Sequence, residues 1–134
     1  MSGHYPGSCL CGGVRVRLEA DFERFYLCHC VYCRKDTGSA HAANLFASTA
    51  RLTWLSGQEQ LRSFKLPATR HTRSFCAVCG SALPSASDER VVIPAGCLDS
   101  ELEKQPDARI FFASRAAWEC GIAGIPTCEG FPPS

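Results

Sequence analysis

Residues 27–38 read LCHCVYCRKDTG and place three cysteines, Cys28, Cys30 and Cys33, within six positions of the chain. Thiols at this density can form disulfides, bind a metal ion or take part in catalysis. The choice decides whether covalent bonds, metal ligation or an apolar core holds the fold together. The rest of the sequence distinguishes these alternatives.

Length and composition indicate one domain that needs no disulfides. A chain of 134 residues can bury an apolar core of useful size. Its beginning lacks the basic and apolar segments of a secretion signal, and no apolar run is long enough to cross a membrane. We therefore expect a single cytoplasmic domain over residues 1–134, with its core at about 6–118, a tail at 119–134 and no membrane contact.

Ten cysteines in such a chain favour metal binding over disulfides, because the cytoplasm keeps thiols reduced. Seven of them fall into CxC, CxCxxC and CxxC motifs, which are spacings typical of zinc ligands. The clustered cysteines are Cys9, Cys11, Cys28, Cys30, Cys33, Cys76 and Cys79, and the isolated ones are Cys97, Cys120 and Cys128.

The charge balance argues against a nucleic-acid partner. Seven thiolates around two zinc ions would change the formal net charge from +1 to −2. Basic residues are scattered among acidic ones, whereas a nucleic-acid binder concentrates them on one face. A zinc-ribbon nucleic-acid binder is therefore the least favoured interpretation.

Hydrophobic patterning predicts a mainly β fold. In residues 13–20, GVRVRLEA, apolar and charged side chains alternate with the period of a strand that buries one face. Seven further short apolar runs follow, separated by glycine and proline: FYLC, AANLFA, RLTWL, LRSFKL, RSFCA, RVVIPAG and RIFFAS. Weak helical signals occur at residues 99–105 and 114–120, and the proline-containing residues 124–134 predict an extended tail.

The cysteine motifs divide into a complete and an incomplete set of zinc ligands. In FCAVCGSAL, Gly80 directly follows the CxxC pair, where a zinc knuckle needs a residue that tolerates positive φ. The CxC pair near the N-terminus is the natural partner that completes four thiolates. The remaining CxCxxC motif supplies three thiolates and leaves a fourth position open, as in catalytic zinc sites.

Taken together, the motifs resemble the glutathione-dependent formaldehyde-activating enzyme family, which also contains the centromere protein V group. The matching segments, in order within residues 6–100, are GSCLCGGVRV, CHCVYCRKDTGSA, LTWLSGQEQLRSF, RSFCAVCGSALP and VVIPAGCLD. The resemblance implies a β-tent fold of short antiparallel sheets that binds two zinc ions. It assigns a structural zinc to Cys9, Cys11, Cys76 and Cys79, and a second zinc to Cys28, Cys30 and Cys33.

The resemblance also implies a zinc-dependent carbon–sulfur lyase similar to S-(hydroxymethyl)glutathione synthase. Such an enzyme adds glutathione, or another small thiol, to formaldehyde or a related carbonyl, with Cys28, Cys30 and Cys33 as ligands of the catalytic zinc. The alternative is a non-catalytic zinc-thiolate module that binds proteins, as in centromere protein V or other β-tent domains. Glutathione carboxylates require cationic partners, for which the candidates are Arg34, Lys35, Arg70, His71 and Arg73.

Cys97 bears on the choice between enzyme and module. The family usually has GTLD where this chain has GCLD. A thiolate from Cys97 would close the central zinc site, whereas a buried Cys97 thiol would leave it open. The oligomeric state is left undetermined.

Histidine and aromatic residues receive simpler interpretations. His29 lies between two ligands, so on an extended segment its side chain should point away from their metal, and we expect a supporting or surface role. His4, His41 and His71 are expected to be exposed, with His71 also a candidate proton acceptor. Trp54 and Trp118 are expected in the core.

Overall fold

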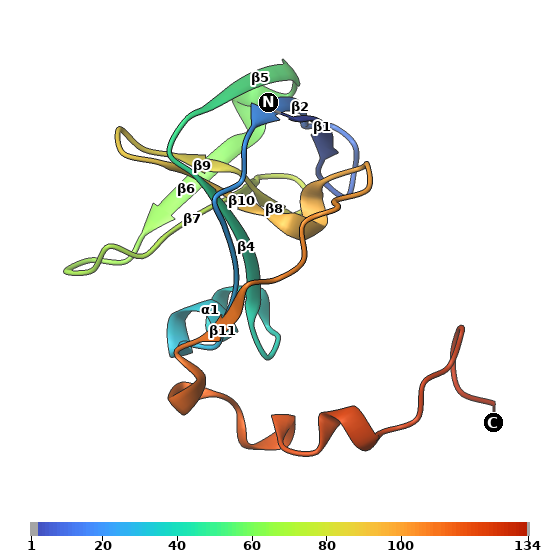
Figure 1. Cartoon of the computed structure of the whole chain (residues 1–134). Helices are drawn as coiled ribbons and strands as arrows, with labels where there is room; N and C mark the ends of the chain where they lie inside the picture. The colour runs from blue at the N-terminus through green and yellow to red at the C-terminus, as the bar shows by residue number, and fades with distance from the viewer. Residues whose placement is uncertain (1–2, 134) are drawn as a thin grey trace.

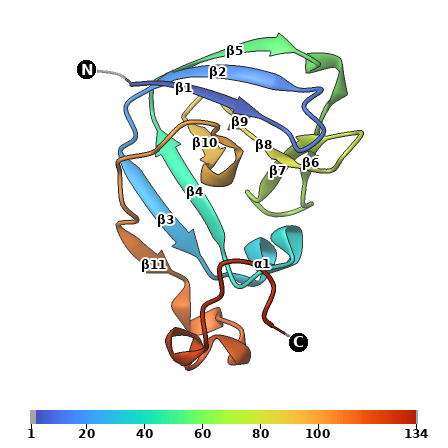
Figure 2. The ribbon, with the colours of Figure 1, turned by 90° about the vertical axis from the view of Figure 1, so that its right-hand side faces the viewer.

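The computed structural model describes residues 3–133, which form three small sheets and one short α-helix (Figures 1 and 2). The first sheet has the order β1-β2-β5, and all its strand pairs are antiparallel. Its strands are β1 (Gly3–Ser8), β2 (Arg15–Ala20) and β5 (Ala50–Ser56). The prediction of a mainly β fold with short antiparallel sheets is confirmed.

A five-stranded sheet with the order β11-β3-β4-β10-β9 forms the centre of the molecule (Figure 2). Its pairs are antiparallel except for β11 and β3, which run parallel. Its strands are β3 (Arg24–Cys28), β4 (Ala42–Ala47), β9 (Ser85–Ala86), β10 (Val91–Pro94) and β11 (Ala108–Ile110). The edge strand β11 thus places the C-terminal segment beside the end of β3.

The third sheet is an antiparallel hairpin with a short added strand, in the order β6-β7-β8. Its strands are β6 (Leu61–Lys65), β7 (Thr72–Cys76) and β8 (Ala82–Leu83). Because β7 ends at Cys76, this hairpin carries the CxxC motif back toward the first sheet.

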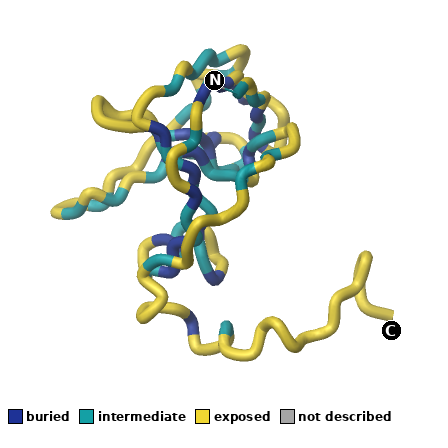
Figure 3. Tube along the Cα trace, viewed as in Figure 1, coloured by how far each residue is buried: buried dark blue, intermediate teal, exposed yellow. Residues whose placement is uncertain are grey.

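The alternating pattern of residues 13–20 forms β2, as predicted. Val16 and Leu18 are buried, whereas Arg15 and Arg17 point to solvent. The buried side chains pack with residues of β3, β4 and β10 between the first and second sheets (Figure 3). This core consists of Val16, Leu18, Phe25, Leu45, Val91, Ile93 and Cys97.

Of the two weak helical predictions, one was wrong and the other corresponds to a short turn, while the α-helix was not predicted. The α-helix is α1 (Val31–Thr37), which lies inside the CxCxxC segment. Residues 99–105 form no helix, and residues 114–120 contain the 3₁₀ turn Ala117–Glu119 and the end of the turn Phe112–Ser114. The other 3₁₀ turns are Gln58–Gln60, Ala95–Cys97 and Ile122–Gly124.

The C-terminal segment beyond β11 runs away from the sheets (Figure 1). Most of it is exposed (Figure 3), and Trp118 keeps 63% of its surface accessible, so its prediction as a core residue was wrong. Few elements lie close enough to cover an apolar side chain there. Trp54, by contrast, packs against the core as predicted. Within residues 3–133, no helix has the length and apolarity needed to span a membrane.

Candidate metal centres and substrate groove

Two cysteines that follow β1 and two at the end of β7 and in the turn after it form one cluster. Cys9 and Cys11 follow β1, while Cys76 ends β7 and Cys79 lies in the turn after it. Their sulfur atoms all lie within 4.8 Å of one another. This spacing suits a single ion with four thiolate ligands, so the predicted pairing of the CxC and CxxC motifs is geometrically possible.

The loops around this cluster direct backbone N–H groups at the sulfurs. Val14 N–H donates to Cys9 Sγ at 3.2 Å, and Val78 N–H donates to Cys76 Sγ at 3.4 Å. Hydrogen bonds from the backbone N–H groups of Cys11 and Ser81 lower the pKa of Cys79 to about 6. The backbone N–H groups thus favour the thiolate, the metal-binding form of cysteine, at Cys79. At Cys11 the hydrogen bond from Gly13 N–H is outweighed by the neighbouring thiols, chiefly Cys9, which raise its pKa to about 11, so a shared cation would be needed for four thiolates.

Two glycines make these loops possible. Gly80 has φ +74°, the left-handed conformation expected after the CxxC pair. Gly57 has φ +72°, and an added Cβ would lie 2.2 Å from the carbonyl oxygen of Gly13. A side chain at position 57 would therefore push the loop that follows the CxC motif out of place.

Cys28, Cys30 and Cys33 form the second cluster, with sulfur atoms also within 4.8 Å of one another. Cys28 ends β3, Cys30 caps the N-terminus of α1, and Cys33 lies in its first turn. Cys30 Sγ accepts the N–H of Cys33 at 3.4 Å, which is the role that a serine or aspartate oxygen usually plays. The helix brings the third thiol back toward the first two.

The three thiols differ in how easily they lose a proton. Burial raises the pKa of Cys28, and burial together with the nearby Cys28 raises that of Cys33. For Cys30, burial is outweighed by the hydrogen bond from Cys33 N–H and by the neighbouring thiols, so its pKa is lowered. Without a cation, the cluster therefore cannot readily carry three thiolates, which is consistent with a metal-binding set.

The three-cysteine cluster opens into a groove of about 970 Å³. Cys28, Cys30 and Cys33 line it on one side, and Arg70 and His71 contribute from the loop before β7. The groove also contains cationic and aromatic residues that sequence reasoning did not select: Arg24, Tyr26, Tyr32, Phe46, Arg90 and Phe111. Arg24, Tyr26 and Tyr32 are close to the CxCxxC motif in sequence. Phe46, Arg90 and Phe111 are far from it along the chain, so their convergence had no signal in the local sequence.

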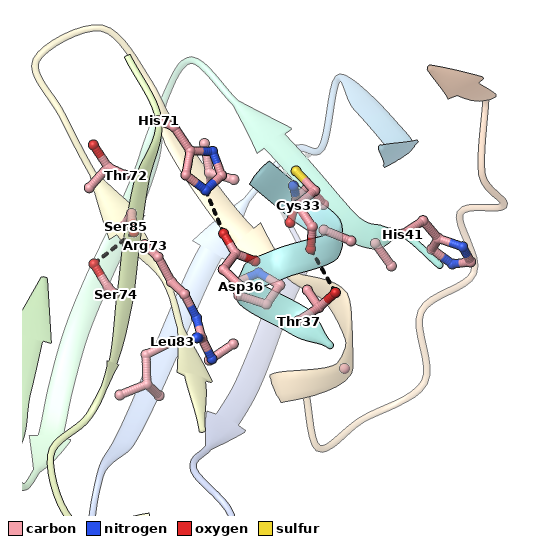
Figure 4. Close-up of a pocket in the computed structure, with 17 residues that line it drawn as sticks. Cys33, Asp36, Thr37, His41, His71, Thr72, Arg73, Ser74, Leu83 and Ser85 are labelled. Carbon is pink, nitrogen blue, oxygen red and sulfur yellow. Dashed lines mark hydrogen bonds and ion pairs between the residues drawn. The ribbon is translucent and has the colours of Figure 1, made fainter. Parts of the chain in front are cut away.

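A smaller cavity of about 190 Å³ adjoins the groove at Cys33 (Figure 4). His71 Nε2 lies 2.5 Å from Asp36 Oδ2 across this cavity, so a hydrogen bond joins α1 to the loop before β7. Only about a fifth of each side chain is exposed, so the prediction that His71 is an exposed residue was wrong. The pairing of Asp36 with His71 was not predicted, because 35 positions separate them.

The basic residues predicted to bind the substrate carboxylates lie in different places. Arg70 lines the groove, Arg73 lines the smaller cavity, and His71 lines both. Arg34 and Lys35 line neither of these two cavities. They occupy the last turn of α1, where positive charge favours the helix C-terminus.

Cys97 lies in the core rather than with the three-cysteine cluster. It packs with Val16 and Leu18, and burial raises the pKa of its thiol to about 12. The groups of metal-ligating residues within residues 3–133 do not include it. Of the two alternatives left open by the sequence, the structure therefore favours a buried thiol. Cys120 and Cys128 are exposed.

The fold and these clusters define a small, mainly β protein with two sets of thiols that could hold metal ions. Comparison with known proteins identifies the family. The sequence model of the glutathione-dependent formaldehyde-activating enzymes matches residues 4–114, and the chain belongs to this family.

Two relatives illustrate the likeness. A Halomonas elongata protein, provisionally named a glutathione-dependent formaldehyde-activating enzyme, is 33% identical over 75% of this chain and 69% of its own length. The crystal structure of a Rhodobacter sphaeroides protein matches with a TM-score of 0.54, covering 78% of this chain and 98% of that one. At 21% identity, the second likeness concerns the fold alone.

Proposed function

We propose that this protein is a zinc-dependent carbon–sulfur lyase of the S-(hydroxymethyl)glutathione synthase type. It would join glutathione, or another small thiol, to formaldehyde or a related carbonyl, and would catalyse the reverse cleavage. The observation that carries the proposal is the opening of the three-cysteine cluster into a groove that also contains arginine side chains. Family membership agrees with this chemistry.

Two zinc ions would be bound, one by Cys9, Cys11, Cys76 and Cys79 and one by Cys28, Cys30 and Cys33. The donor sets fit this metal, because clustered thiolates at these separations are typical zinc ligands. Zinc at the second cluster would supply a Lewis acid that lowers the pKa of a bound thiol or polarises a carbonyl oxygen. Such thiol clusters require a reducing compartment, so we place the protein in the cytoplasm.

The groove suits a substrate of glutathione size. Small-molecule sites usually enclose roughly 300–1,000 Å³, and this groove has about 970 Å³. Arg24, Arg70 and Arg90 would pair with the two substrate carboxylates, since guanidinium groups bind carboxylates with two parallel hydrogen bonds. Tyr32 and Phe111 would cover the apolar parts of the peptide.

The Asp36–His71 pair would transfer the proton of the substrate thiol to the carbonyl oxygen. With Asp36 accepting from Nε2–H, the neutral ring keeps a lone pair on Nδ1. The substrate thiol would give its proton to His71 Nδ1 while its sulfur bonds to the carbonyl carbon. The carbonyl π electrons move to oxygen, which then takes the proton from His71, so that thiol and aldehyde give a hydroxymethyl thioether with no other reactant.

The test follows adduct formation from glutathione and formaldehyde by NMR exchange spectroscopy, with the uncatalysed rate measured alongside. We expect the zinc-loaded protein to accelerate both formation and cleavage, and Arg70→Ala to raise KM for glutathione more than it lowers kcat. Arg51→Ala, which removes an exposed arginine that does not line the groove, serves as the matched control. Unchanged exchange rates in the presence of protein would refute the proposed activity.

A further inference from the structure

Two histidines and a glutamate form a third cluster that neither cysteine site contains. His29 follows the end of β3, His41 directly precedes β4, and Glu119 lies in the 3₁₀ turn of the C-terminal segment. One potential ligand atom from each lies within 4.8 Å of the others. His29 is completely buried, which excludes the surface alternative of the supporting or surface role expected for it, and His41 is half-buried, so the exposure expected for His41 was wrong.

The hydrogen bonds of His29 determine where its ring proton lies. Nδ1 is 2.9 Å from the carbonyl oxygen of Leu27, which can only accept, so Nδ1 carries hydrogen. In the neutral ring, Nε2 therefore presents a lone pair. That lone pair faces Glu119 Oε1 at 2.9 Å, and an ionised carboxylate is also an acceptor. Two acceptors at this distance require a cation between or beside them, either a proton or a metal ion.

Two more atoms of the cluster distinguish a metal ion from a proton. His41 Nδ1 and Glu119 Oε2 are both buried and have no hydrogen-bond partner. A proton shared by His29 and Glu119 would leave both of them unsatisfied, which is costly for buried polar atoms. A metal ion beside the three side chains would give each of them a partner. Burial and the neighbouring His29 lower the pKa of His41, which keeps its ring neutral and able to ligate.

The surroundings are those of a built site rather than a surface contact. The rings of His29 and His41 lie 5.1 Å apart, and Phe112 packs edge-on against His29 at 5.0 Å. The Nδ1–H bond to Leu27 fixes the orientation of the His29 ring, as supporting hydrogen bonds commonly do for metal-binding histidines. Arg109 is the nearby cation, and its charge also lowers the His41 pKa.

We propose that His29, His41 and Glu119 bind a divalent transition-metal ion, with zinc as the best match, separate from both cysteine clusters. Two imidazoles and one carboxylate are a known zinc donor set that leaves one position open. The ion would fix residues 117–119 of the otherwise exposed C-terminal segment to the end of β3. The inference goes beyond the proposed function and does not depend on it.

Cobalt substitution tests the site directly, because the spectrum of Co²⁺ reports its ligands. The untagged full chain, loaded with two equivalents of Zn²⁺ so that the two thiolate clusters are filled first, would be titrated with Co²⁺ and followed by absorption. We expect one added equivalent with weak visible bands and without the intense near-ultraviolet charge transfer that thiolate ligands produce. His41→Ala and Glu119→Gln should each weaken this binding by about 100-fold, the upper range seen even for supporting residues of metal sites.

His4→Ala is the matched control, since His4 also pairs with a glutamate, Glu19, but on the exposed surface. It should bind cobalt as the wild type does. If the wild type takes up no cobalt beyond thiolate exchange, the cluster is a buried ion pair and the proposal is wrong. Equal binding by wild type and His41→Ala overturns it as well. Both readouts are independent of catalysis, so they remain decisive if the lyase activity fails.

Discussion

The two cysteine clusters use the same ligand type in opposite structural settings. The four-cysteine cluster joins segments about 65 positions apart in the sequence, because Cys9 follows β1 and Cys76 ends β7. The three-cysteine cluster is local, since its ligands fall between the end of β3 and the first turn of α1. The four-cysteine cluster joins two distant parts of the chain, whereas the three-cysteine cluster has one side facing a groove.

Burial supports the same contrast. Cys9 and Cys76 pack with Val14 and Leu83 in an apolar cluster of their own, so ligation and core packing act together there. Around Cys28 and Cys33, the buried neighbour is Ala42, and the groove begins immediately beyond. A metal at the first cluster should therefore stabilise the fold, whereas one at the second should contribute mainly to the chemistry.

Cys76→Ala should have the largest effect. It removes a ligand of the four-cysteine cluster and leaves a void beside Leu83. Structural zinc contributes roughly 10–16 kcal/mol in small zinc-finger peptides, which is as large as the usual stability of about 5–15 kcal/mol for a whole domain. We expect loss of cooperative thermal unfolding by circular dichroism and loss of the zinc bound there. A cooperative transition close to that of the wild type would show that the four cysteines do not hold the fold.

Cys30→Ala tests the other half of the comparison. The variant should keep a cooperative unfolding transition and bind one zinc fewer by elemental analysis. Its rate of adduct formation from glutathione and formaldehyde should fall to the uncatalysed rate. Because Cys30 also caps α1, a loss of about 1 kcal/mol in stability is expected. Collapse of the whole protein would show instead that both clusters are structural.

His71→Gln should reduce the rate without affecting metal content. His71 lines the groove but is not among the clustered thiols, and glutamine keeps a polar side chain of similar length. Loss of a positioned proton acceptor usually costs about 10²-fold or more, and we expect a fall in kcat of this size at unchanged zinc content. An unaltered kcat would remove His71 from the mechanism.

Motif spacing predicted both thiol clusters, because ligands two or three residues apart are constrained by local turn geometry. The alternation in residues 13–20 predicted β2 for a similar reason. Helix α1 escaped prediction because Cys30 caps it with a thiol instead of the usual oxygen, although Gly38 in the left-handed conformation ends it in the ordinary way. Distant positions could be paired only where motifs marked both partners, as for the CxC and CxxC cysteines. Contacts without a motif were out of reach, as the Asp36–His71 pair and the contact between Glu119 and His29 show.

Cys97→Ala should produce the smallest effect, and it tests whether the three-cysteine cluster is open. Cys97 is the cysteine that could have turned the open cluster into a second closed one, yet it packs with Val16 and Leu18 instead. Removal of its buried sulfur should cost about 1–2 kcal/mol in a denaturation experiment, as for other small cavities in a core. Zinc content and the rate of adduct formation should stay at wild-type values. A loss of one zinc would place the Cys97 thiol in the central site, and the groove would then face a metal with no position left for a substrate.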